Sequence, residues 1–138
     1  MKLYTGGAGV IVYNENRSKI LLGNRTDGQG WCLCGGKKEL GETPVETAIR
    51  ESEEEFGVKI SKNDIIFNGT IYAKIVSHGE TINVISDIFS TDVFEGEITP
   101  QLEEISEIRW CGFEDILELD KIFNTTLVSL NKFVIPNW

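Results

Sequence analysis

The sequence has 138 residues, 41% of them hydrophobic, which is enough to bury the core of one compact domain over residues 1–138. The formal net charge of −9 argues against a nucleic-acid polymer as partner, because such a partner requires a basic surface. It does not argue against a nucleotide, because a metal ion can neutralise the phosphates of a small ligand.

The sequence shows no secretory leader and no stretch long enough to cross a membrane. Its three cysteines, an odd number without a signal sequence, fit reduced thiols. Cys32 and Cys34 are close together, but the one histidine is distant in sequence, so they make a poor zinc site. We therefore expect a cytoplasmic protein without a membrane partner, either a monomer or a homodimer.

The first part of the chain predicts two strands followed by a glycine-rich loop. Residues 8–13 are rich in β-branched side chains, and residues 19–23 return as a second strand after a polar turn. After a loop rich in turn formers, residues 31–33 lead to Gly35 and Gly36. We expect this glycine pair to lie in a loop, where the backbone can approach a ligand closely.

A helix at residues 44–56 is the most clearly marked element. Thr43 is a good N-cap, Pro44 fits the first helical position, and Glu46 completes a capping box. Gly57 is a natural end for the helix. Successive residues rotate by roughly 100°, which separates a core-facing stripe from an acidic face. The predicted stripe consists of Val45, Ala48, Ile49, Ser52 and Phe56.

The acidic face of this helix carries Glu51, Glu54 and Glu55, with Arg50 beside Glu51. Like charges on adjacent turns repel one another unless a cation lies between them. Carboxylate oxygens suit Mg²⁺ or Mn²⁺, and Mg²⁺ often shares its coordination sphere with phosphates. Together with Lys37 and the glycine pair, the helix predicts a metal–phosphate site. A solvated acidic helix face would explain the same residues.

The middle of the chain predicts a hairpin. Residues 65–76 form a strand, bent at Asn68 and Gly69, and residues 81–90 pair back after a turn. His78 lies in this turn and is the only histidine. We expect it to be solvated rather than catalytic.

The last part predicts an acidic loop that enters a strand at residues 102–110, a short helix at 113–117 and a longer helix at 121–134. The apolar residues of the longer helix have a helical spacing and should cover the sheet. These residues are Ile122, Phe123, Leu127, Leu130 and Val134. Strands on both sides of the first helix and a terminal helix predict a mixed sheet between helices.

Residues 36–58 resemble the signature of the Nudix hydrolase family. The motif is G-x5-E-x7-R-E-U-x-E-E-x-G-U, where U is a bulky aliphatic residue, and every charged and glycine position is present here. Two positions depart from the family pattern: Ser52 replaces a bulky aliphatic residue, and Cys34 stands where many members carry proline. The strand pattern on either side extends the resemblance over most of the chain. It implies an α/β class protein, an α/β/α sandwich with a mixed sheet.

The resemblance also implies roles for individual residues. Glu54 and Glu55 should bind a divalent metal ion, together with the carbonyl group of Gly36. Glu51 should be a further metal ligand or the base that deprotonates water, and Arg50 should hold it. The implied catalytic residues are therefore Arg50, Glu51 and Glu54.

Further site residues are expected around this group. We assign substrate binding to Arg25, Gly35 and Lys37. Glu42 should support the metal site or the adjoining loop. In several family members an acidic residue of the late loop adds a metal ligand or a base, and Glu103 and Glu104 are the candidates here. A solvated loop position is an equally good interpretation of each.

The resemblance implies Mg²⁺-dependent hydrolysis of a nucleoside diphosphate linked to another moiety, with Mn²⁺ as an alternative metal. The short chain is similar to the MutT-like group, which cleaves nucleoside triphosphates to a monophosphate and pyrophosphate. ADP-ribose, nucleotide sugars and dinucleoside polyphosphates remain alternative substrates, and a nucleotide-sensing domain without turnover remains an alternative function. The strand aromatics could stack on a base or fill the core. They are Trp31, Phe67, Tyr72 and Phe89.

Overall fold

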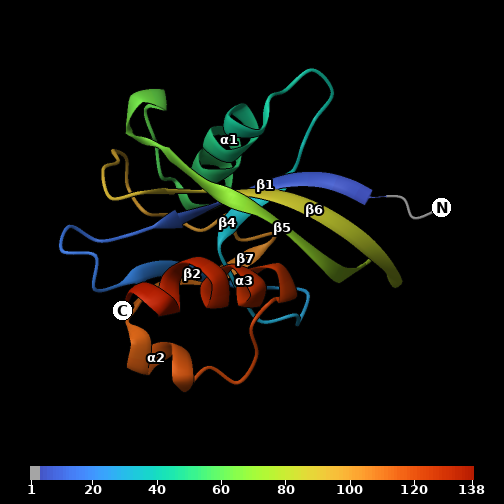
Figure 1. Cartoon of the computed structure of the whole chain (residues 1–138). Coiled ribbons are helices and arrows are strands. Elements are labelled where there is room, and N and C mark those ends of the chain that lie inside the picture. Colours follow the sequence, from blue (N-terminus) through green and yellow to red (C-terminus); the bar gives the residue numbers. More distant parts are fainter. Residues whose placement is uncertain (1–3) are drawn as a thin grey trace.

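Two β-sheets and three α-helices make up the computed structural model, which describes residues 4–138 (Figure 1). The strands are β1 (Tyr4–Val12), β2 (Ile20–Arg25), β3 (Trp31–Cys32), β4 (Cys34–Lys37), β5 (Ile66–Ser77), β6 (Glu80–Thr91) and β7 (Ile105–Cys111). The helices are α1 (Pro44–Phe56), α2 (Phe113–Leu117) and α3 (Asn124–Ser129). Among residues 4–138, no helix is long and apolar enough to span a membrane.

The larger sheet is mixed and has the strand order β4-β1-β6-β5. Strand β1 runs parallel to β6, with Gly7 opposite Ser86, and antiparallel to β4, with Gly9 opposite Gly35. The smaller sheet, β3-β2-β7, is antiparallel. Figure 1 shows α1 on one side of the larger sheet and α3 on the other. This is the predicted α/β/α sandwich with a mixed sheet.

Strand β1 separates two hydrophobic cores, because side chains alternate between the faces of a strand. Val10 and Val12 pack into the core that contains Phe56 of α1. Ile11 and Tyr13 point the other way, into the core that contains Leu130. The burial of β1 on both faces matches its position in the middle of the sheet.

Helix α1 has the predicted bounds and caps. The Thr43 side chain accepts a hydrogen bond from the backbone N–H of Glu46, and the Glu46 side chain accepts one from the backbone N–H of Thr43. Gly57 ends the helix with φ 70°, a left-handed conformation that glycine adopts at little cost. The predicted hairpin is also confirmed: β5 pairs with β6, and a bulge lies between Phe67 and Gly69.

One segment differs from its prediction. Residues Cys34–Lys37 form strand β4 rather than a loop. Strand β4 pairs with residues 7–10 of β1, most of which lie in the predicted strand. The glycines allow this pairing to be close, because a Cβ atom on Gly35 would lie 2.4 Å from the carbonyl oxygen of Ala8.

The C-terminal helix also differs. Helix α3 begins at Asn124, and a π-helical turn (Leu130–Val134) and a 3-10 turn (Ile135–Asn137) follow it. Leu127 is 42% exposed, so the expectation that it covers the sheet is wrong. The later start of the helix and its wider final turn place Thr126 and Ser129 on the buried face instead.

Gly23 of β2 provides a test of how closely the smaller sheet packs on α1. A Cβ atom at Gly23 would lie 2.8 Å from Cζ of Phe56 and 2.9 Å from Cγ2 of Ile105, both buried. We expect Gly23→Ala to lower the free energy of unfolding by about 1–3 kcal/mol through overpacking. Urea denaturation would measure the change. Gly6→Ala is the matched control, since a Cβ atom there meets nothing within 4 Å, and an equal loss in both variants would contradict the argument.

Candidate active site

Arg50 is the hub of the acidic cluster on α1. Its Nε and Nη2 atoms donate to the two carboxylate oxygens of Glu42, at 2.7 and 3.0 Å. Its Nη1 atom donates to Glu51 at 2.8 Å and to Glu54 at 3.1 Å. Nη2 also donates to the carbonyl oxygen of Lys37 at 3.2 Å, which ties the helix to the end of β4. One guanidinium group thus holds three carboxylates and a strand terminus.

Glu42 is the most firmly held of these carboxylates. Besides the two bonds from Arg50, it accepts hydrogen bonds from the Thr47 hydroxyl and from the backbone N–H of Glu39. The hydrogen bonds from Arg50 are the main cause that lowers the pKa of Glu42 to about 2. The same contacts raise the pKa of Arg50. Glu42 therefore anchors the guanidinium group, which matches its predicted supporting role in position.

Glu55 differs from its neighbours because it is buried, with only 5% exposure. Its Oε1 atom accepts a hydrogen bond of 2.8 Å from the backbone N–H of Gly35. Burial is the main cause that raises the pKa of Glu55 to about 8, and the nearby Glu51 and Glu104 carboxylates raise it further. The interpretation of α1 as a uniformly solvated acidic face is therefore wrong at this position.

Glu51 lies between these two environments. Its side chain is 15% exposed, whereas that of Glu54 is 51% exposed. Burial raises the pKa of Glu51, while Arg50 opposes the rise. Gly36 of β4 makes the approach of Glu51 possible, since a Cβ atom on Gly36 would lie 2.5 Å from Cδ of Glu51.

The donor chemistry of this group fits a divalent cation. Glu51, Glu54 and Glu55 supply oxygen ligands, and burial raises the pKa values of Glu51 and Glu55, so that a nearby cation would favour their ionised forms. Across residues 4–138, no three acidic, histidine or cysteine side chains are arranged so that they could hold a metal ion together. Glu51 and Glu54 are hydrogen-bonded to Arg50 instead.

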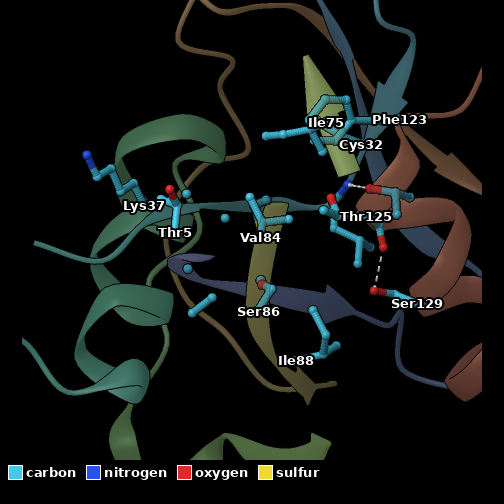
Figure 2. A pocket seen from close by; sticks show the side chains of 18 of the residues that line it. Thr5, Cys32, Lys37, Ile75, Val84, Ser86, Ile88, Phe123, Thr125 and Ser129 are labelled. Carbon is cyan, nitrogen blue, oxygen red and sulfur yellow. Dashed lines mark hydrogen bonds between the residues drawn. The ribbon is translucent and has the colours of Figure 1, made fainter. Parts of the chain in front are cut away.

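A narrow cavity of about 220 Å³ adjoins the cluster on the sheet face opposite α1. In Figure 2, Val84, Ser86 and Ile88 follow one another along β6, with Lys37 toward one end of the cavity and Phe123 toward the other. The cavity is hollow because small residues line its floor and large apolar residues its walls. The floor residues are Gly7, Gly9, Gly35 and Ser86.

A second and wider cavity, of about 930 Å³, lies at the tip of the β5–β6 hairpin and meets the first. His78 lines it and is exposed, as expected of a turn residue. Five residues line both cavities: Arg25, Glu55, Ile75, Ser77 and Phe123. We refer to the two adjoining cavities together as the cleft. Glu55 belongs to the acidic cluster and also lines this cleft.

The predicted substrate-binding residues all line this cleft. Gly35 and Lys37 face the narrow cavity. The guanidinium group of Arg25 lies over the ring of Phe123, 4.0 Å from its centre, and pairs with Asp27 at 2.6 Å. The hydrogen bond from Arg25 is the main cause that lowers the pKa of Asp27 to about 2. A substrate phosphate at Arg25 would therefore compete with Asp27.

The two late-loop candidates separate in the structure. Glu104 comes close enough to Glu55 to raise its pKa, and it lines the wide cavity. Glu103 lines the same cavity, and its backbone carbonyl accepts a hydrogen bond from Thr26. Only Glu104 thus joins the carboxylate cluster.

The strand aromatics do not line the cleft, and Trp31 and Phe89 fill the core, which was one of their two expected roles. Trp31 and Phe89 are buried, and Phe67 and Tyr72 are exposed, but none of the four lines either cavity. Phe123 lines both cavities. The apolar spacing of the last helix predicted that Phe123 packs on the sheet. No sequence signal indicated that Phe123 would also face the cleft.

The buried carboxyl group of Glu55 predicts a pH dependence of stability without metal. Its folded-state pKa of about 8 lies well above the ordinary value of about 4.5 for a glutamate side chain. The neutral form is therefore favoured on folding, and this stability is lost as pH rises from 4.5 through 8. We expect a loss on the order of 2 kcal/mol between pH 6 and pH 8.

Glu55→Gln should abolish this loss, because glutamine can still accept the hydrogen bond from Gly35 but does not ionise. Urea denaturation in EDTA at the two pH values would measure the difference. Glu53→Gln is the matched control, because Glu53 is an exposed residue of the same helix. The same pH dependence in Glu55→Gln as in the wild type would contradict the assignment.

Comparison with known proteins identifies the family of the chain. An uncharacterized Nudix hydrolase of Rhodococcus erythropolis is 36% identical over 122 residues, covering 78% of this chain and 65% of that protein. A dihydroneopterin triphosphate diphosphatase of Haemophilus influenzae is 28% identical over 124 residues, covering 83% and 78%. The chain spans less than two thirds of the length of each of the first three curated relatives that it matches.

The fold comparison covers nearly the whole chain. The crystal structure of a MutT NUDIX hydrolase from Burkholderia pseudomallei has a TM-score of 0.78 at 19% identity, covering 96% of this chain and 99% of that one. At this identity the likeness shows the fold. The model of the NUDIX domain family matches residues 3–129. The chain therefore belongs to the Nudix family.

Proposed function

We propose that this chain, as one domain over residues 1–138, hydrolyses nucleoside diphosphate-linked compounds with Mg²⁺, and that nucleoside triphosphates are its main substrates. The observation that carries the proposal is the position of Glu55, which joins the carboxylate cluster around Arg50 to the floor of a narrow, largely apolar cavity. Such a cleft provides a place for a nucleoside beside a place for its phosphates. A nucleoside monophosphate and pyrophosphate would be the products.

Glu51, Glu54 and Glu55, with the backbone of Gly36, are the residues that would hold Mg²⁺ or Mn²⁺. When bound, the ion supplies an acidified water molecule and neutralises charge on the phosphoryl oxygens. Family membership supports a divalent metal in general terms, and the oxygen-only donor set supports Mg²⁺.

The chain's own residues prepare the site for this ion. Arg50 orients the carboxylates of Glu51 and Glu54 by hydrogen bonds of 2.8 and 3.1 Å. Glu51, partly buried and hydrogen-bonded to Arg50, is placed to serve either as a ligand of this ion or as the base that accepts the proton of the attacking water. The low exposure of Glu55 keeps solvent from the inner side of the cluster.

The cleft supports a nucleotide as substrate. Phe123 adds apolar surface to the narrow cavity, and Ser86 offers a hydroxyl group at its floor. Lys37 and Arg25 place positive charge toward the phosphates. The H. influenzae relative, named for a triphosphate that contains a pterin, supports a triphosphate over a nucleotide sugar.

A product assay tests the proposal. The protein would be incubated with Mg²⁺ and nucleoside triphosphates, oxidised dGTP, ADP-ribose, nucleotide sugars or dinucleoside polyphosphates, and the products separated by chromatography. Pyrophosphate and a nucleoside monophosphate are expected. If ADP-ribose were the one compound cleaved, giving two monophosphate products, the substrate class would be ADP-ribose rather than nucleoside triphosphates. Nucleotide binding without any turnover would overturn the proposal in favour of a sensing domain.

Glu54→Gln tests the metal assignment. We expect turnover to fall about 100-fold or more, the loss typical of removing one group that stabilises charge in the transition state. The fold should survive, because Glu54 is half exposed. Steady-state kinetics would measure turnover, and circular dichroism the fold. Glu53→Gln, on the exposed side of the same helix, should retain the wild-type rate; a near-normal rate in Glu54→Gln would remove the assignment.

A further inference from the structure

We propose that Cys34 and Ser52 form a positioning pair that sets the distance between β4 and α1. Through this distance the pair holds the helix carboxylates against the glycine backbone of β4. The inference rests on the proposed function, because it concerns the geometry of the same site. It assigns a role to two buried side chains of the core.

The two side chains meet in the core. Both residues have 0% exposure, and Sγ of Cys34 lies 3.4 Å from Oγ of Ser52. The Ser52 hydroxyl donates its single hydrogen to the carbonyl oxygen of Ala48 at 2.7 Å. The Cys34 thiol donates to the carbonyl oxygen of Val10 at 3.6 Å and lies against the Ser52 hydroxyl. The pair therefore connects α1, β4 and β1.

Cys34 is the only side chain of β4 that separates this strand from α1. Residues two apart on a strand share a face, so Cys34 and Gly36 both face the helix. The contact of Cys34 with Ser52 and the close approach of Gly36 to Glu51 agree with this alternation. Because glycine has no side chain, the spacing between strand and helix depends on the small Cys34–Ser52 contact.

The site residues lie directly beside this pair. Ser52 follows Glu51 in the helix, and Cys34 precedes Gly35, whose N–H donates to Glu55 at 2.8 Å. A change in the spacing between β4 and α1 must alter this hydrogen bond. It must also alter how closely Glu51 approaches the backbone of β4.

Cys34 and Ser52 are also the two positions at which the sequence departs from the Nudix pattern. The structure brings these departures into direct contact. Protein interiors are close-packed, so a change of size at one position of such a contact is felt at the other. The two residues thus behave as a matched small pair.

A size-exchange experiment tests the pair. Ser52→Val adds a methyl group against the sulfur of Cys34, and Cys34→Ala removes that sulfur. Three quantities would be measured: Mg²⁺ affinity by calorimetry, kcat and KM by steady-state kinetics, and hydrogen exchange of the Gly35 amide by NMR.

We expect Ser52→Val to lower both Mg²⁺ affinity and kcat by roughly 10- to 100-fold, the range that a displacement of the carboxylates by about 1 Å can cause. KM should change little, and the Gly35 amide should exchange faster. In the double variant Cys34→Ala/Ser52→Val, Mg²⁺ affinity, kcat and exchange of the Gly35 amide should return most of the way to their wild-type values.

Ser129→Val separates positioning from mere stability. Ser129 also has 0% exposure, and its hydroxyl also donates to a carbonyl one turn earlier, that of Thr125 at 2.8 Å. This control should lose stability but keep wild-type Mg²⁺ affinity and Gly35 exchange. The inference is overturned if Ser129→Val has the same effects as Ser52→Val, or if a folded Ser52→Val changes none of the measured quantities.

Two further outcomes of these measurements also test the inference. If Ser52→Val does not fold, Ser52→Ala takes its place, and faster exchange at Gly35 relative to the wild type supports the pair while unchanged exchange overturns it. If the wild type shows no Mg²⁺-dependent turnover, the proposed function fails. Exchange of the Gly35 amide, which needs neither metal nor substrate, then still decides the positioning role.

Discussion

The candidate site depends on the way a single guanidinium group holds several carboxylates together. Arg50 contacts Glu42, Glu51 and Glu54 and also binds the carbonyl of Lys37. Without it, like charges on adjacent turns of α1 would repel one another. Its planar fork can bind one carboxylate through two atoms and still reach others, which the single ammonium group of lysine cannot do.

This arrangement leaves the negative charge unevenly compensated. Glu42 has the strongest contact with Arg50, whose hydrogen bonds lower the pKa of Glu42 to about 2. Glu55, on the cleft side, has only the N–H of Gly35, and burial raises its pKa to about 8. The poorly compensated charge thus lies beside the cavity, where a cation and phosphates would meet it. Arg50 orients the carboxylates without occupying the position beside the cavity where the cation would bind.

Close approach between backbone and side chains is the second condition of the site. Glycine at position 36 admits Glu51, and glycine at position 23 admits the ring of Phe56. The small Cys34–Ser52 contact allows β4 to lie near α1. On the other face of the sheet, small residues of β1 and β6 leave the cavity open. Small residues thus serve the carboxylate cluster on one face and the cleft on the other.

The sequence by itself determined the elements whose signals are local. The bounds of α1 follow from Thr43, Pro44 and Gly57, because capping and termination act within a few residues. The spacing of the acidic residues predicted the cluster and the family. The tertiary structure decided the rest, because it depends on which strands pair and which helix turns face them. Pairing with β1 made residues 34–37 a strand, and only packing could bury Glu55, bring Glu104 beside it and turn Phe123 toward the cleft.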